Sequence, residues 1–164
     1  MKAEMNGLNE RVVKKLIEKS LHISSAESCS GGLFSALITA VPGSSEILDE
    51  AIVTYSNNAK SKRLGVREET LQSYGAVSKQ TANEMAEGIV SYASSDIGIA
   101  ITGIAGPGGG TEEIPVGTVW IGCCVRDAVF TKKLQLDGTR EIIRQKAKEE
   151  AILFVCECLK SCNI

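Results

Sequence analysis

One run of residues, 96–106, does most to restrict the folds open to this chain. It reads DIGIAITGIAG, and it is almost wholly apolar with several β-branched side chains. Such a run is typical of a strand in the middle of a sheet, buried on both faces. Helices must then cover both faces, so the sequence predicts a three-layer α/β/α domain.

Strand-like and helix-like segments alternate along the rest of the chain. Strands are expected within 21–28, 47–56, 116–125 and 128–136, and the last two are close enough in sequence to form a hairpin. Apolar and amphipathic patterns predict helices within 6–20, 33–40, 57–65, 67–75, 78–95 and 139–162. The fold class is therefore α/β with a mixed, mostly parallel sheet, and residues 1–164 are expected to form a single domain.

The charge pattern argues against two classes of partner. The chain has 18 basic and 20 acidic residues, a net charge of −2, and no basic block that could follow a nucleic-acid backbone. No apolar stretch is long enough to span a bilayer, and the first residues lack the apolar core of a signal peptide. We therefore expect no nucleic-acid partner, no membrane partner and a cytoplasmic location.

The six cysteines and the single histidine do not form a metal-binding pattern. Five cysteines lie in an apolar run or near the end of the last predicted helix, which are Cys123, Cys124, Cys156, Cys158 and Cys162. We expect them to be small buried side chains rather than a disulfide framework. CxxC pairs and spaced histidines are absent from the sequence, so no zinc site is expected. His22 is interpreted as a structural histidine.

Two glycine clusters follow predicted strands, SCSGG at 28–32 and GIAGPGGG at 103–110. Turns at the carboxyl ends of strands present free backbone N–H groups, and ligands of open α/β sheets bind there. A glycine turn can equally serve only close packing or positive φ, and GPGGG could be a surface loop. Neither cluster matches a P-loop or a dinucleotide-binding GxGxxG, which disfavours ATP hydrolysis and dinucleotide binding.

Three residues that could act as nucleophiles are consecutive in the first cluster, namely Ser28, Cys29 and Ser30. A nucleophile of this kind needs a base. The only histidine, His22, lies at the far end of the same predicted strand, so a serine–histidine–carboxylate triad is hard to build. The sequence therefore favours a lysine as the base.

Lys60 is the best candidate base on local grounds. If Asn57 caps the short helix within 57–65, Lys60 is the third helical residue, where the positive end of the helix dipole disfavours its ammonium form. The alternative is a solvated lysine on a helix face, as we expect for Lys62.

Several motifs carry a resemblance to a known family. AESCSGG, VPGSS, VTYSNNAK, LGV, YGAVS and TGIAGPGGGTEEIPVGTVW occur in the order and spacing of the CinA C-terminal domain family. From about residue 8 through the last helix, the chain resembles the stand-alone nicotinamide-nucleotide amidohydrolases of that family, also called NMN deamidases or PncC-type. The resemblance implies a serine/lysine enzyme that converts nicotinamide mononucleotide and water to nicotinic acid mononucleotide and ammonia. It also implies no metal or cofactor, a mixed-sheet α/β/α fold and a homo-oligomer.

Carried over motif by motif, the resemblance implies that Ser28 is the nucleophile and Lys60 the base. Tyr55, which heads the second motif, would take part in proton transfer or pack on the substrate ring. The common family forms are ESCTGG and YSNEAK, so Ser30 and Asn58 are departures. Serine keeps the hydroxyl of threonine, whereas Asn58 removes a charge beside the base. Larger family members also carry a nucleotide-pyrophosphatase-like domain, and no such activity is expected here.

The remaining expectations concern the substrate. We expect the oxyanion to form near the backbone N–H groups of the turn at 30–32, and the nucleotide to contact ten residues: Ser30, Gly31, Gly32, Asn57, Thr102, Gly103, Gly106, Gly108, Gly109 and Gly110. Two alternatives remain open at the level of sequence. The chain could be a nucleotide-binding module without turnover, or it could hydrolyse another small heteroaromatic amide.

Overall fold

The computed structural model describes residues 7–164. Five strands form one sheet in the order β2-β1-β3-β4-β5. Their bounds are β1 Ile23–Glu27, β2 Leu48–Val53, β3 Ile97–Gly103, β4 Thr118–Val125 and β5 Ala128–Gln135. The pairings of β1 with β2 and β3 are parallel, whereas β3 with β4 and β4 with β5 are antiparallel. The sheet is therefore mixed, as expected, with β4 running against the other four strands.

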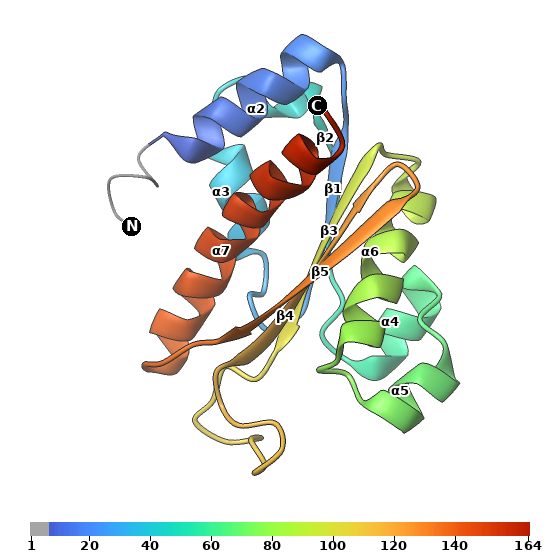
Figure 1. The fold of residues 1–164 in the computed structure, drawn as a ribbon, viewed down its shortest axis with the longest axis vertical. Helices are drawn as coiled ribbons and strands as arrows, with labels where there is room; N and C mark the ends of the chain where they lie inside the picture. The colour runs from blue at the N-terminus through green and yellow to red at the C-terminus, as the bar shows by residue number, and fades with distance from the viewer. Residues whose placement is uncertain (1–6) are drawn as a thin grey trace.

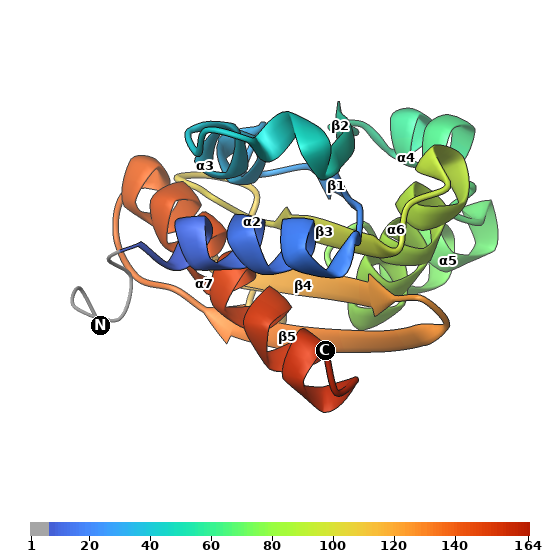
Figure 2. The ribbon, with the colours of Figure 1, turned by 90° about the horizontal axis from the view of Figure 1, so that it is seen from above.

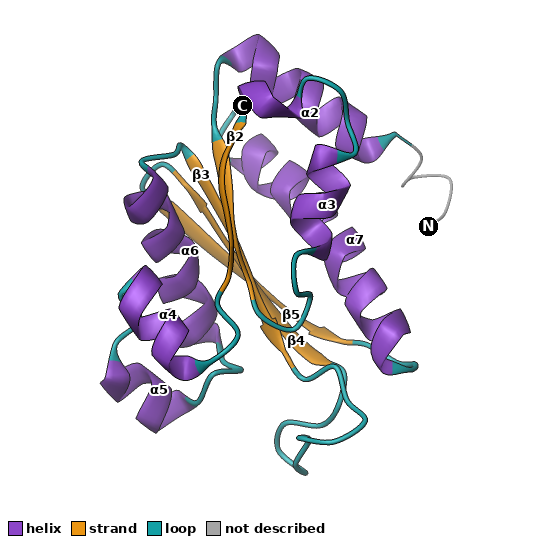
Figure 3. Cartoon of the chain, turned by 180° about the vertical axis from the view of Figure 1, so that it is seen from behind, coloured by secondary structure: helices purple, strands orange, loops and turns teal. Residues whose placement is uncertain are grey.

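Helices cover both faces of the sheet (Figure 1 and Figure 3). One face carries α2 Leu8–Lys19, α3 Leu33–Thr39 and α7 Arg140–Ser161. The other carries α4 Asn57–Leu64, α5 Glu68–Tyr74 and α6 Lys79–Ala93. Figure 2, which shows the molecule from above, places the sheet between these two groups. The three-layer α/β/α architecture expected from the sequence is confirmed.

The hydrophobic core is built around β3, which lies within the apolar run 96–106. Residues of β3 from Ile97 to Thr102 are buried, and separate apolar clusters pack on the two faces of the sheet. Gly98 and Gly122 allow α6 to approach the sheet closely, because a Cβ at either position would clash with the carbonyl oxygen of Ala86 or Ala82. The approach of this helix therefore depends on residues without a side chain.

One predicted helix boundary is wrong. The N-cap of α4 is Ser56 rather than Asn57, because Ser56 has an extended backbone and its Oγ accepts a hydrogen bond of 3.1 Å from the N–H of Ala59. Asn57 is thus the first helical residue, and Lys60 lies one position deeper in the helix than predicted. By contrast, the predicted cap Ser78 of α6 is confirmed.

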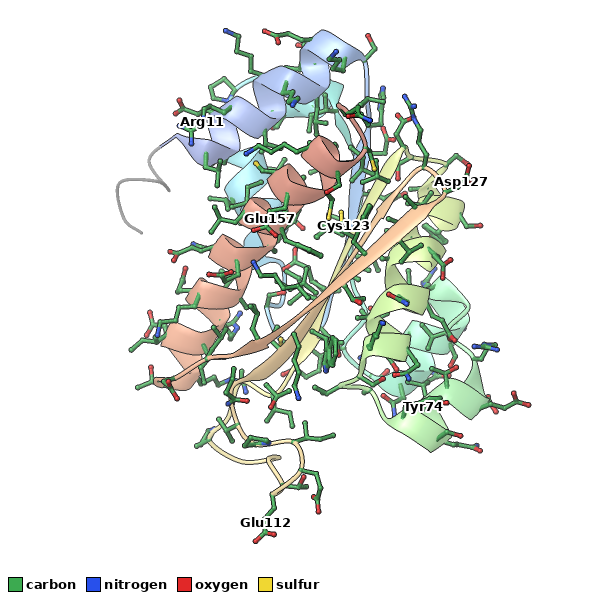
Figure 4. All side chains as sticks on the ribbon, in the orientation of Figure 1. Arg11, Tyr74, Glu112, Cys123, Asp127 and Glu157 are labelled. Carbon is green, nitrogen blue, oxygen red and sulfur yellow. The ribbon has the colours of Figure 1, made fainter. Side chains whose placement is uncertain are left out.

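The structure also locates the side chains considered for metal binding. The six cysteines are free thiols, of which Cys29, Cys123, Cys124 and Cys158 are buried. Cys123 lies between the sheet and α7 (Figure 4). His22 Nδ1 lies 2.8 Å from Asp49 Oδ1, in accord with a structural role. Within residues 7–164, no helix is long and apolar enough to cross a bilayer.

Candidate active site

The candidate site lies at the carboxyl edge of the three parallel strands. Glu27 of β1 is paired with Val53 of β2 and with Ile101 of β3 in one row of the sheet. The next residue along each strand lies just beyond that row, and these residues are Ser28, Thr54 and Thr102. Main-chain bonds hold this edge, since Ser28 N donates to Ile101 O at 2.9 Å and Thr54 N to Glu27 O at 2.9 Å. The sheet itself therefore positions Ser28.

Ser28 and Lys60 are brought into contact. Lys60 Nζ lies 3.1 Å from Ser28 Oγ, 3.0 Å from the carbonyl oxygen of Thr54 and 3.1 Å from that of Tyr55. Helical side chains lean toward the N-terminus of their helix, and this direction lets Lys60 reach the two carbonyls that precede α4. The lysine is 1% exposed and the serine 8% exposed. The pair is therefore shielded from bulk water.

The surroundings of Lys60 favour its neutral form. Burial lowers the pKa of Lys60 below its ordinary value, and the negative form of Cys29 opposes this effect. No carboxylate in the described part of the chain forms an ion pair with Lys60. A neutral amine has two N–H donors and one lone pair. In that form, two N–H donors to the carbonyls of Thr54 and Tyr55 would leave the lone pair for the hydroxyl of Ser28, whereas the ammonium donates to all three oxygens.

The other two candidate nucleophiles, Cys29 and Ser30, have different surroundings from Ser28. The Ser30 hydroxyl donates to Glu27 Oε2 at 2.7 Å, in the buried interior below the turn. Burial raises the pKa of the Cys29 thiol to about 11, against the opposing effect of the backbone amides of Cys29 and Ser30. At neutral pH Cys29 is therefore a thiol rather than the reactive thiolate. Among the three candidates, Ser28 is the one in contact with a base.

A cavity of about 270 Å³ opens above this pair. It brings together eight of the residues predicted for the site: Ser28, Tyr55, Lys60, Thr102, Gly103, Gly106, Gly108 and Gly109. Cys29, Ala76, Val77 and Arg140 also line it, together with Ile104 and Ala105. Thr102 Oγ1 donates to the carbonyl of Ala76 at 2.7 Å, which ties β3 to the wall that precedes α6.

Five predicted substrate-binding residues do not line this cavity: Ser30, Gly31, Gly32, Asn57 and Gly110. The N–H of Gly31 donates to Ser28 O at 3.1 Å, and that of Gly32 to Glu27 Oε2 at 3.0 Å. These two amides therefore serve the turn and do not provide the expected oxyanion site.

The second motif also extends outside the cavity. Asn57 and Asn58 face a separate hollow beside α5. Both are exposed. Position 58, where the common family form has a glutamate, therefore lies on the outer surface of α4 and not in the cavity with Lys60. Gly110 packs against the part of its loop that leads back to β4, where a Cβ on Gly110 would lie 2.7 Å from Val116 N.

Sequence reasoning missed Arg140. This residue begins α7, and its Nη1 donates to Gly106 O at 2.8 Å while its Nη2 donates to the Tyr55 hydroxyl at 2.9 Å. The phenol of Tyr55 thus contacts Arg140, whereas its main-chain carbonyl contacts Lys60. A cation at a helix N-terminus opposes the helix dipole, and this conflict in the sequence TREIIR was the available signal.

The loop between β3 and β4 forms one wall of the cavity. Its first part, residues 104–109, contains the lining glycines, and its tip extends beyond the sheet, with Glu112 at the far end (Figure 4). The tip residues 111–113 are exposed. The near part of the loop therefore shapes the cavity, and the far part projects into solvent.

Comparison with known proteins places this geometry in context. Residues 5–159 match the family described as the CinA C-terminal domain. A Clostridium acetobutylicum protein named as competence-damage inducible is 53% identical over 140 residues, which is 85% of this chain and 34% of that protein. A CinA-like protein of Kosmotoga olearia is 53% identical over 152 residues, or 93% of this chain and 37% of that protein. The chain thus spans about a third of the length of these curated relatives.

A solved structure agrees over nearly the whole chain. The competence/damage inducible protein CihA from Agrobacterium tumefaciens has a TM-score of 0.90 and 39% sequence identity, and the match covers 93% of this chain and 94% of that one. The fold described above is therefore also the fold of a relative.

Proposed function

The chain belongs to the CinA C-terminal domain family, and we propose that it acts as a nicotinamide-nucleotide amidohydrolase. The reaction would convert nicotinamide mononucleotide and water to nicotinic acid mononucleotide and ammonia. The names of the relatives support the family only. The proposed activity depends on one observation, the contact of a buried lysine with a serine hydroxyl and two carbonyls.

The first step uses this contact directly. Neutral Lys60 accepts the proton of the Ser28 hydroxyl while Ser28 Oγ attacks the carboxamide carbon. The resulting ammonium of Lys60 is stabilised by the carbonyl oxygens of Thr54 and Tyr55, which lie at 3.0 and 3.1 Å. The carboxamide oxygen becomes an oxyanion and needs hydrogen-bond donors. The pyridinium of the substrate withdraws electrons and makes the carboxamide more electrophilic.

The remaining steps return the proton and renew the serine. Lys60 donates its proton to the amide nitrogen, the C–N bond breaks, and ammonia leaves an ester between the nicotinoyl group and Ser28. A water molecule then loses a proton to Lys60 and attacks this ester. The ester bond breaks, Ser28 regains its proton from Lys60, and nicotinic acid mononucleotide is released.

Arg140 and the glycine loop are suited to the phosphate of the substrate. The guanidinium presents several donors in a plane, and such a group can bind phosphate oxygens through two bonds. Its side chain lines the cavity beside Gly108 and Gly109, and both glycines expose their main chain. We assign the phosphate to this end of the cavity and the carboxamide to the end with Ser28.

The direct test is turnover by the purified protein. Incubation with nicotinamide mononucleotide should release ammonia and nicotinic acid mononucleotide in equal amounts, with a kcat/KM far above that for nicotinamide. The difference arises because binding energy from the phosphate positions the carboxamide. An absence of ammonia would contradict the proposed activity. Equal kcat/KM values for the two amides would contradict the proposed substrate.

A variant of Arg140 tests the placement of the phosphate. Arg140→Ala should lower kcat/KM for nicotinamide mononucleotide by about 10- to 100-fold, the value of a charge-assisted hydrogen bond. Hydrolysis of nicotinamide, which has no phosphate, should change by less than about 3-fold because Arg140 would not contact it. Steady-state kinetics with both amides measure the two effects. A similar loss on both would show that Arg140 only supports the loop through Gly106.

A further inference from the structure

The turn that carries Ser28 is held by a guanidinium from a distant helix. Arg144 of α7 donates from Nε to the carbonyl oxygen of Cys29 at 3.0 Å and from Nη2 to that of Ser30 at 3.0 Å. Gly31 has φ +61°, and a Cβ there would lie 3.1 Å from Arg144 Nη2, so the turn fits closely against this side chain. Arg144 does not line the cavity. It therefore acts on the far side of the turn.

The direction of these carbonyls determines the direction of the amides. In a trans peptide the C=O and the N–H point in opposite directions. Because the carbonyl of Cys29 points at Arg144, the N–H of Ser30 points away from it. Cys29 lines the cavity, and among residues 7–164 no main-chain carbonyl accepts from the N–H of Cys29 or of Ser30. The N–H of Ser30 is thus directed away from Arg144, and both amides are without a main-chain partner in this part of the chain.

A buried carboxylate holds the other end of the same turn. Glu27 is 1% exposed and accepts five hydrogen bonds. Oε2 receives the Ser30 hydroxyl and the N–H groups of Gly32 and Phe34, and Oε1 receives the N–H and the hydroxyl of Ser35. Glu27 therefore takes the donors that begin α3, a role that an N-cap side chain usually fills. Arg144 takes carbonyls and Glu27 takes donors, so the turn is held from both sides.

We propose that Arg144 is a positioning residue that, together with Glu27, fixes the backbone N–H groups of Cys29 and Ser30 as the oxyanion hole. This inference depends on the proposed hydrolysis through Ser28. A backbone N–H of the residue after the nucleophile serves this purpose in other hydrolases with a strand-to-helix nucleophile turn. A cation on the carbonyl side also polarises the Cys29–Ser30 peptide and strengthens its N–H as a donor. Arg144 would thus act on the transition state through the peptide without contact with substrate.

The experiment uses Arg144→Ala and Arg144→Lys, with Lys146→Ala as the matched control. Lys146 also lies on α7 and also donates to a main-chain carbonyl, that of Asp137, but outside the turn. Arg144→Ala should lower kcat for nicotinamide mononucleotide by about 100-fold, the effect of removing one oxyanion donor. KM should change by less than about 3-fold, since the ground state makes no such bond. In the wild type, kcat/KM should rise with pH as Lys60 loses its proton, and the position of this pH limb should not move in the variant.

A second measurement does not require turnover. Pyridine-3-boronic acid can bind Ser28 when Oγ adds to boron, the hydroxyl proton passes to Lys60, and boron becomes a tetrahedral anion. Boron NMR of the complex should show this adduct in the wild type and in Lys146→Ala. The affinity should fall by about 100-fold in Arg144→Ala, because the boronate oxygen occupies the oxyanion position. Arg144→Lys should lie between, because an ammonium cannot reproduce the planar pair of bonds.

The outcomes separate the two proposals. Wild-type protein that forms the adduct but releases no ammonia would contradict the proposed function and leave the boronate comparison valid. Equal boronate affinity in the wild type and in both Arg144 variants would overturn the oxyanion assignment. A shift of the pH limb in Arg144→Lys would overturn it too, because Arg144 would then act through Lys60. If Arg144→Ala does not fold, Arg144→Lys provides the same comparison, with a smaller loss expected.

Discussion

Ser28→Ala is expected to lower kcat for nicotinamide mononucleotide by about 10⁴-fold or more, the usual loss when a member of a catalytic unit is removed. The hydroxyl is the atom that attacks the carboxamide, and alanine leaves no substitute for it. Ser28 is held by main-chain bonds at the sheet edge, and these bonds do not need its side chain. The variant should therefore keep its fold and bind substrate, as measured by ammonia release, thermal unfolding and calorimetric binding.

Cys29→Ser is the matched control for this variant. It alters the adjacent residue, which lines the same cavity but makes no contact with Lys60 within hydrogen-bond distance. Its kcat should remain within about 10-fold of the wild-type value, because the thiol packs as a small side chain. An inactive Cys29→Ser together with an active Ser28→Ala would show that the thiol is the nucleophile.

The sequence predicted the architecture because its strongest signals are local. An apolar, β-branched run as long as β3 is typical of a strand at the centre of a sheet. The strands β4 and β5, on either side of Arg126, are too close in sequence for a crossover connection, so they must pair as an antiparallel hairpin. The helix boundaries were less certain. Ser56 and Asn57 are adjacent and both are good caps, so sequence alone could not choose between them. The structure selects Ser56 because its Oγ reaches the N–H of Ala59.

Some residues of the candidate site were also predictable from local sequence and others were not. Ser28 and Lys60 belong to short motifs, and the order of the strands brings those motifs together. Arg144 could not be predicted, because it reaches the turn that carries Ser28 only through the docking of α7, more than a hundred residues later in the chain. Arg140 left a local signal, the cation at the start of a predicted helix, but its contacts with Gly106 and Tyr55 also depend on that docking. Gly31 and Gly32 were assigned to substrate because glycine turns often present free amides, whereas here their amides are used within the turn.

Lys60→Arg is the prediction that distinguishes a base from a positive charge. An unperturbed lysine has a pKa of about 10.4 and is almost fully protonated at neutral pH, so a working base needs a lower value. Burial lowers the pKa of Lys60. Arginine keeps the positive charge but cannot lose its proton, and methionine has neither a charge nor a basic nitrogen. Both variants should therefore lose activity by about 10⁴-fold, as Ser28→Ala does. Near-normal turnover by Lys60→Arg would show that Lys60 only supplies charge.

The pH dependence of the wild type gives a second test of the same lysine. Only the neutral amine can act as the base, so kcat/KM should rise with pH through a limb below the ordinary lysine value. Stability should follow the same equilibrium. Between the lowered pKa and about 10.4 the unfolded chain binds a proton that the folded chain does not, so the free energy of unfolding rises with pH in that window.

Lys60→Met removes this proton and provides the reference for the stability measurement. Other groups also titrate at high pH, notably Cys29 and Cys124, for which burial raises the pKa to about 11. Lys60 acts on the Cys29 thiol, but up to about pH 10 both thiols stay largely protonated in the folded protein. Over that range their contribution is common to both proteins, so it cancels in the difference between wild type and Lys60→Met. That difference in the free energy of unfolding should increase from neutral pH toward about pH 10, as measured by urea denaturation. A difference that stays constant over this range would mean that Lys60 has an ordinary pKa in the folded protein, and the base would then have to be another group.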